Sequence, residues 1–396
     1  MRTKRVLFVS GSIGLGHVTR DLAIAAALRR LRPGVTVAWM AGSPAREWLR
    51  DAGEWLLPEA EAQGNLSQVA ERATGDGPMN LAAYVWLAAE DFERNVLAFR
   101  QAVSHTDFDL WIGDETYEIA TALANWRIRK RAPFVMIYDF VGLDAVGHSV
   151  TERLRVFGSN LLWALWMDRA VDLALLIGEL EDIPERRMGP LLPGRRALAR
   201  RRYHPVGYVL PFDCRDLADR AALRARLGYG PAPLVVCAAG GTSVGAELLT
   251  VCAGAVPLLR RQQPDLQVHI VAGPRIPTSA IPSPPGVTVS GYVPRLYEHF
   301  AAADLAVVQG GGTTTLELTA LRVPFLYVPL EGHCEQEEVA RRVARHGAGV
   351  RLRMATLTPE ILAGHILAHL GEQVTYPPIP VEGAERAAEL IAGLLN

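Results

Sequence analysis

The stretch Val307–Glu337, VVQGGGTTTLELTALRVPFLYVPLEGHCEQE, decides the fold of this 396-residue chain. Leu305–Val308 is a short apolar run with β-branched residues, and three glycines follow it. Because glycine tolerates positive φ and close approach of a ligand, the segment predicts a strand, a glycine turn and a helix. The threonines Thr313–Thr315 can cap that helix, which Pro324 ends before the strand Phe325–Val328. Exposed N–H groups at such a helix start form a phosphate site.

Glu317 is the most informative residue of this stretch. It lies about one turn inside the predicted helix, where a carboxylate would repel a bound phosphate unless it had a partner of its own. A sugar hydroxyl is such a partner. The polar turn Glu331–Gln336 follows the next strand, at the edge where open α/β sheets bind ligands. Two interpretations stay open at this point: a seat for phosphate, ribose and a polyhydroxylated group, or an ordinary tight turn in which Glu317 favours the helix dipole.

The composition is that of a soluble globular protein, with 49% hydrophobic and 21% charged residues and a net charge of −1. This length suits two domains, and the charge balance gives no general attraction to nucleic acid. The apolar part of the N-terminus is too short for a signal peptide, and no apolar run is long enough to span a membrane. The four cysteines have neither metal-ligand spacing nor the density of a disulfide scaffold. We therefore expect reduced cysteines and a cytoplasmic protein.

A first glycine loop lies near the N-terminus. Val6–Val9 reads as a strand, and the loop Gly11–Gly16 leads into an alanine-rich helix that reaches about Leu31. The loop matches neither G-x-G-x-x-G nor a Walker sequence. The second strand, Val35–Met40, is followed by Ala41 rather than by the acidic residue that a dinucleotide ribose needs. These features disfavour NAD and ATP.

His17 lies where this loop meets the helix. A lone histidine is more often structural, but this position favours a catalytic base. Three acids come directly after two later predicted strands: Asp114, Glu115 and Asp139. Parallel strands bring such acids to the same edge of the sheet as His17. Asp114 is the preferred partner, orienting the imidazole as the carboxylate of a catalytic triad does. A helix-capping role is the alternative for Glu115 and Asp139.

The middle of the chain is less specific. Asn160–Leu176 predicts a helix in which Trp163 and Trp166 either pack into the core or line an apolar pocket. The arginine-rich stretch Arg186–Arg202 predicts a solvated loop, with contact to anionic lipid or substrate as the alternative. Tyr203–Asp213, with two prolines and a glycine, is interpreted as a linker.

The second half repeats the plan of the first. The predicted strand Leu234–Ala238 is followed by a glycine loop and a helix, as Val6–Val9 is. This weak duplication predicts an α/β protein of two facing Rossmann-like domains with a cleft between them. We expect an N-terminal acceptor-binding domain at 1–208, a C-terminal donor-binding domain at 209–375, and a C-terminal helix at 376–396 that packs back on the first domain.

Taken in order, these motifs resemble the nucleotide-sugar glycosyltransferases of the two-domain B-type (GT-B) fold, in the superfamily that unites MurG-type enzymes with UDP-glucuronosyl-, UDP-glucosyl- and natural-product glycosyltransferases. The resemblance covers nearly the whole chain. It implies that the loop GSIGLGH ends in a catalytic base, His17, which pairs with Asp114. The acceptor side then comprises Gly14, Gly16, Glu115 and Asp139.

The resemblance also implies a donor site in the second domain. The GGTSVG loop lies near the diphosphate, a short segment after a strand holds the base, and the glycine-rich helix start carries the phosphates. Glu317 binds ribose, and a Glu-Gln pair recognises the donor sugar. The implied donor-binding residues are Gly241, Thr242, Ser243, Tyr292, Val293, Gly311, Gly312, Thr313, Thr314, Glu317, Glu335 and Gln336. The chain departs from the plant-type signature, which has Asp-Gln at the last two positions and His-Cys-Gly-Trp where this chain has Val308–Gly312.

The implied function is inverting transfer of a sugar from a UDP- or TDP-sugar to a hydroxyl of a small-molecule or lipid-like acceptor. No metal and no cofactor are expected, and no nucleic-acid partner. Peripheral membrane contact through Arg186–Arg202 is part of the hypothesis. A UDP-sugar epimerase of the same fold and a nucleotide-sugar binding protein without transferase activity are the alternatives.

Overall fold

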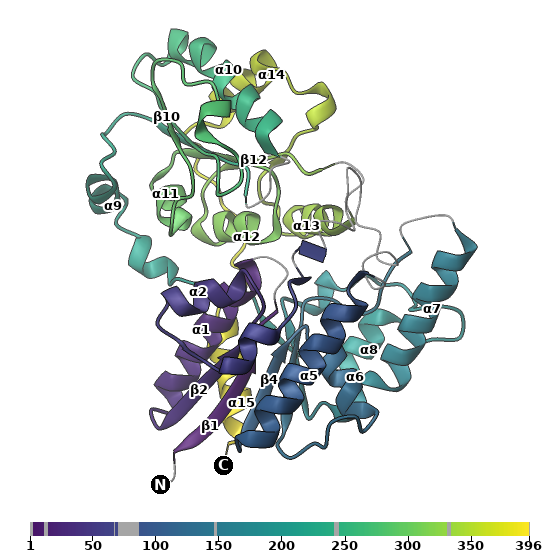
Figure 1. The fold of residues 1–396 in the computed structure, drawn as a ribbon. Coiled ribbons are helices and arrows are strands. Elements are labelled where there is room, and N and C mark those ends of the chain that lie inside the picture. Colours follow the sequence, from purple (N-terminus) through teal and green to yellow (C-terminus); the bar gives the residue numbers. More distant parts are fainter. Residues whose placement is uncertain are drawn as a thin grey trace. The chain divides into compact units, whose positions relative to one another are not determined.

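The computed structural model describes residues 3–11, 15–66, 68–69, 87–145, 149–240, 245–330 and 334–395. The chain divides into two compact units (Figure 1). Unit 1 comprises Met1–Pro211 and Pro380–Asn396, and unit 2 comprises Phe212–Ile379. Both breaks lie a few residues beyond the expected boundaries at 208 and 375.

Unit 1 is built on a seven-stranded sheet in the order β3-β2-β1-β4-β5-β6-β7. Its strands are β1 Lys4–Val9, β2 Val35–Met40, β3 Trp55–Leu56, β4 Leu110–Asp114, β5 Phe134–Tyr138, β6 Leu173–Ile177 and β7 His204–Gly207. All neighbouring strands pair in parallel. The strand order reverses between β1 and β4, so the carboxyl ends of these two strands border the crevice in which such sheets bind ligands.

Helices cover both faces of this sheet. One layer holds α1 Leu15–Leu31, α2 Ala45–Asp51 and α15 Gly383–Gly393, and the other holds α5 Ala89–His105, α6 Tyr117–Ala124, α7 Val150–Leu165 and α8 Arg195–Arg202. Among the described residues of the unit, 3-10 turns lie at Pro58–Ala62, Met167–Ala170 and Leu180–Asp182. The C-terminal helix α15, yellow in Figure 1, packs against α1 although the whole of unit 2 separates them in sequence. Its alanines and Ile391 join the same buried core as α1.

Unit 2 repeats the topology with a six-stranded parallel sheet in the order β10-β9-β8-β11-β12-β13. Its strands are β8 Leu234–Ala238, β9 Gln267–Val271, β10 Val287–Ser290, β11 Leu305–Val308, β12 Phe325–Tyr327 and β13 Val350–Arg351. The helices α10 Ala246–Gln262 and α14 Pro359–His369 cover one face. The other face carries α9 Arg220–Leu227, α11 Leu296–Ala302, α12 Gly312–Leu321 and α13 Cys334–Arg345. Short 3-10 turns lie at Cys214–Leu217, Thr278–Ala280 and Met354–Thr356. The predicted pair of Rossmann-like α/β domains is thereby confirmed.

The helix predicted for Asn160–Leu176 is wrong in its second half. Helix α7 ends at Leu165, and the run LALLI forms β6 between β5 and β7. A strand buried on both faces has no alternating pattern, so a short apolar run cannot be told from a helix by periodicity alone. Trp163 packs in the core and donates through Nε1 to the Tyr203 hydroxyl at 2.8 Å, whereas Trp166 is exposed.

Two other segments differ from the prediction. The arginine-rich stretch is partly helical, because Leu198 and Ala199 give α8 a face that packs into the core. The expected linker contributes β7, whose Pro205 is tolerated at the edge of the sheet. Among the helices that the structure describes, none has both the length and the apolarity needed to cross a bilayer.

Candidate functional site

In unit 1, the carboxyl ends of β1 and β4 place His17 and Asp114 together. His17 lies in the first turn of α1, and Asp114 is the last residue of β4. A side chain at Gly11 would place its Cβ 3.1 Å from the Asp114 carbonyl oxygen and 3.3 Å from His17 Nδ1. A side chain at position 11 would therefore be in tight contact with Asp114 and His17 and would require them to shift slightly.

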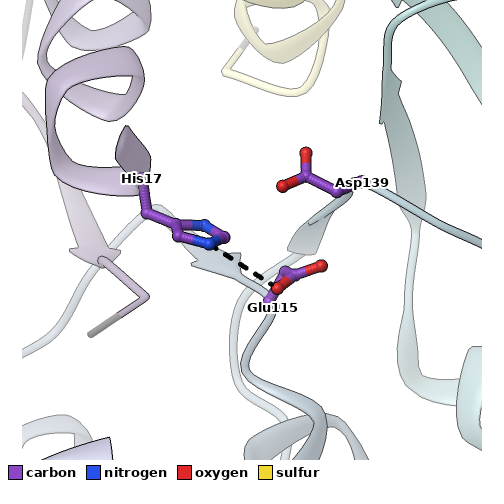
Figure 2. A group of neighbouring side chains, drawn as sticks. All are labelled: His17, Glu115 and Asp139. Atoms are coloured by element: carbon purple, nitrogen blue, oxygen red, sulfur yellow. Dashed lines mark ion pairs between the residues drawn. The ribbon is translucent and has the colours of Figure 1, made fainter. Parts of the chain in front are cut away.

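The imidazole of His17 has a different neighbour at each nitrogen. Nδ1 is 2.9 Å from Oδ2 of Asp114, whose side chain is fully buried. Nε2 is 3.8 Å from Oε2 of Glu115, as Figure 2 shows. The Tyr117 hydroxyl donates to the other Glu115 oxygen at 3.2 Å. Glu115 has a backbone φ of 50°, a conformation that non-glycine residues rarely adopt and that often marks functional sites.

The charges around His17 shift several pKa values. Burial alone would lower the pKa of His17, but the Asp114 carboxylate outweighs it and raises the value to about 10. Burial would raise the pKa of Asp114, yet Arg20 and His17 lower it to about 2. Burial, with Asp139 nearby, raises the pKa of Glu115 to about 7. Asp114 is thus the anion that holds the imidazole, and Glu115 can exchange a proton near neutral pH.

Arg20 is part of this site, although the sequence analysis gave it no role. It follows His17 by three residues on α1, so both side chains project from the same face of the helix. Its guanidinium donates to Asp114 Oδ1 at 2.5 Å through Nη2 and to Asp139 through Nη1. The same Nη2 is 2.9 Å from Nδ1 of His17. The spacing His-x-x-Arg at a helix start was the signal that could have revealed it.

One group of side chains in the described part of the chain has the composition of a metal site. Single donor atoms of His17, Glu115 and Asp139 lie within 4.8 Å of one another (Figure 2). A cation with bonds of about 2.1 Å would need these atoms to move closer. It would also face the positive charge of Arg20, which already binds Asp139. We therefore assign no metal to this group.

In unit 2, the glycine turn leads directly into α12. Gly310 has a φ of 85°, which glycine adopts without strain. The predicted threonine caps are wrong: the N-cap residue is Gly311, and no side chain caps the helix. The hydroxyl of Thr315 instead donates back to the Gly311 carbonyl at 3.0 Å. The N–H groups of the first turn, Gly312–Thr314, have no carbonyl partner within the helix and suit an anion.

Glu317 is a buried carboxyl group on α12. Only 8% of the residue is exposed, and burial raises its pKa to about 8. Within the described ranges, its side chain makes no hydrogen bond and no ion pair. A buried polar group without a partner costs free energy, so a ligand that supplied hydroxyl groups here would remove that cost.

The structure gives mixed information on the other predicted donor residues. Gln336 uses its side-chain oxygen to accept the Leu330 N–H at 2.7 Å, which orients the amide. Tyr292 is half exposed and Val293 partly buried, directly after β10. Five predicted positions lie outside the described residues or side chains: Gly14, Gly241, Thr242, Ser243 and Glu335.

Comparison with known proteins identifies glycosyltransferases as similar in sequence. The glycosyltransferase family 28 C-terminal domain matches residues 235–387. An uncharacterized glycosyltransferase of Methanopyrus kandleri is 31% identical over 195 residues, 48% of this chain and 54% of that protein. The UDP-N-acetylglucosamine–N-acetylmuramyl-(pentapeptide) pyrophosphoryl-undecaprenol N-acetylglucosamine transferase of Mycolicibacterium vanbaalenii is 35% identical over 152 residues, 37% of each chain. The chain thus spans about half or less of these relatives.

The fold extends the likeness to the whole chain. The crystal structure of the kitacinnamycin glycotransferase superposes with a TM-score of 0.66 over 100% of both chains, at 17% identity. Two parallel α/β units of this topology define the GT-B fold. Residues 235–387 are thus similar to the glycosyltransferase family 28 C-terminal domain, and the chain as a whole has the GT-B fold.

Proposed function

We propose that this chain is an inverting glycosyltransferase that moves a sugar from a UDP- or TDP-sugar to a hydroxyl group of its acceptor. The observation that carries the proposal is the pairing of His17 Nδ1 with the buried Asp114 carboxylate at 2.9 Å, while Nε2 lies 3.8 Å from Oε2 of Glu115 at the carboxyl end of β4. The buried, unpartnered Glu317 and the family 28 domain support a nucleotide-sugar donor.

The reaction is a direct displacement at the anomeric carbon. Because the pKa of His17 is about 10, the imidazole must first lose its Nε2 proton. In the neutral ring Asp114 accepts the Nδ1–H, so Nε2 takes the proton of the acceptor hydroxyl. The acceptor oxygen bonds to the anomeric carbon while the bond from that carbon to the diphosphate oxygen breaks. The N–H groups of Gly312–Thr314 and the positive end of α12 stabilise the charge on the departing nucleoside diphosphate. No metal is required for this step.

The acceptor is a small molecule or a lipid-like molecule. Relatives named for a pyrophosphoryl-undecaprenol substrate and for kitacinnamycin support both classes. Contact with anionic lipid through Arg186–Arg202 remains part of the proposal, but Arg195 binds Asp144 and Arg196 binds the Ile183 carbonyl, so only part of this stretch is available. Free thiols at Cys214, Cys237 and Cys252 are consistent with the cytoplasmic location that we propose.

A two-stage assay tests the function. Thermal shift with a panel of nucleotide sugars identifies the donor, and acceptor candidates are then added to the best donor. A transferase releases UDP or TDP only when acceptor is present. A changed nucleotide sugar without acceptor would identify an epimerase instead, and donor binding without either product would identify a binding protein.

A further inference from the structure

We propose that Arg20 positions Asp114 and Asp139 around His17 and supplies a positive charge that lowers the proton affinity of the imidazole, which the surrounding acids raise. Arg20 is a positioning residue here, since it acts through His17 rather than on the substrate. The inference rests on the proposed function in one respect only, namely that His17 serves as the base.

The contacts of Arg20 join three elements of unit 1. From α1, its two terminal nitrogens reach Asp114 at the end of β4 and Asp139 after β5. Its side chain is only 11% exposed, and its Nε has no hydrogen-bond partner in the part of the chain that the structure describes. The guanidinium is therefore fixed by these two carboxylates.

Arg20 and Asp114 together select the tautomer of His17. Nδ1 faces both Asp114 Oδ2 and Arg20 Nη2 at 2.9 Å, and it can either donate to the first or accept from the second. Because Arg20 also donates to Asp114 Oδ1, the carboxylate stays ionised and takes the Nδ1 proton. The lone pair of the neutral ring then lies on Nε2, which is the form that a base needs.

The charge of Arg20 opposes an excess of acids. The acids that face His17 are Asp114 and Glu115 from β4, Asp139 after β5, and Asp21, which is buried on α1 and accepts a hydrogen bond from Ser10. Burial lowers the pKa of His17, and Asp114 and Glu115 raise it. Among the described residues, Arg20 is the cation whose charge lowers this pKa. Without Arg20, the imidazole would hold its proton more tightly and be a poorer base at neutral pH.

Imidazole protonation can be measured directly in the full chain. Histidines labelled with ¹⁵N report the protonated fraction of each ring, and the His17 signal is assigned by its loss in His17→Ala. A titration of the labelled protein gives the pKa of His17 in each variant. We expect a higher pKa of His17 in Arg20→Gln than in the parent protein, because Arg20 lowers it, and a pKa close to that of the parent in Arg20→Lys.

Two further variants guard against misfolding and nonspecific effects. Asp139→Asn removes a carboxylate that binds Arg20 and lies near His17, so the pKa of His17 should fall below that of the parent protein. Arg29→Gln is the matched control, since it breaks a bidentate ion pair between α1 and Glu54 away from the site. It should leave His17 unchanged.

The result that overturns the inference is a protonated fraction of His17 that is the same in the parent, Arg20→Gln and Asp139→Asn. If protonation shifts as expected but the pH dependence of sugar transfer does not follow it, the role of Arg20 stands and the assignment of His17 as base fails. The two proposals therefore fail separately.

Discussion

Replacing Glu317 with alanine tests the donor site of unit 2. If its carboxyl group, which is ionised above its pKa of about 8, binds the ribose hydroxyls, the loss should weaken UDP binding at pH 9 by about 1.5 to 3 kcal/mol, the range for hydrogen bonds to a charged group. This corresponds to a roughly 10- to 140-fold higher dissociation constant. If Glu317 only favours the dipole of α12, its removal relieves repulsion with the diphosphate, and UDP binding should stay level or tighten.

The same change should not destabilise the free protein. The pKa of Glu317 is about 8 in the folded state and near 4.5 in the unfolded chain. Folding therefore takes up a proton. As the pH rises from 4.5 toward 8, the free energy of unfolding falls, and at pH 7 it is lower by about 3 kcal/mol than at acidic pH. The substitution Glu317→Ala removes this loss of stability, but it also removes side-chain packing that contributes about 1 kcal/mol. The free energy of unfolding at pH 7 should thus rise by about 2 kcal/mol.

Calorimetric titration of UDP and chemical denaturation measure the two effects. Glu317→Gln preserves the volume of the side chain without its charge, and Glu360→Ala, an exposed glutamate on α14, should leave UDP affinity unchanged. Unchanged or tighter UDP binding by Glu317→Ala would refute the ribose assignment.

Three further predictions concern both units. Asp114→Asn should lower turnover by about one to three orders of magnitude because it disturbs the orientation of His17. If Asp114→Asn keeps full activity while Glu115→Gln is inactive, Glu115 rather than Asp114 is the partner of His17. Transfer activity should survive EDTA, and loss that Mg²⁺ or Mn²⁺ reverses would contradict the metal-free displacement. Burial lowers the pKa of His269 to about 4, so the unfolded chain binds the extra proton and stability should fall by up to about 2 kcal/mol between pH 6.5 and 4. Denaturation of His269→Phe over this range should lack that loss; equal loss in both proteins would exclude His269 as its source.

Sequence patterns predicted the parts of the fold that local chemistry determines. Strands that end in glycine loops or acids were recognisable because parallel sheets place such residues at their carboxyl ends, and the structure confirms β1, β8 and β11 at these places. Strand β6 was not recognisable, since its burial depends on neighbours that are distant in sequence. Helix α8 was not predicted, because its many arginines indicate a solvated loop. Its buried face is formed by Leu198 and Ala199.

The candidate site was predictable only in part for a similar reason. His17 and Asp114 stand out because each follows a recognisable strand. Arg20 looks like any polar residue on a surface helix until β4 and β5 bring Asp114 and Asp139 against it. The His-x-x-Arg spacing places Arg20 on the same face of α1 as His17, but it does not show which carboxylates the guanidinium binds.

The measurement that tests the account most directly compares the single-turnover rate and the donor affinity of His17→Ala with those of the parent protein. We predict a rate of sugar transfer that is lower by about two to four orders of magnitude, as expected for the loss of a general base, with a nearly unchanged dissociation constant for the nucleotide sugar. An unchanged rate of transfer would contradict the account, because it would remove His17 from the mechanism.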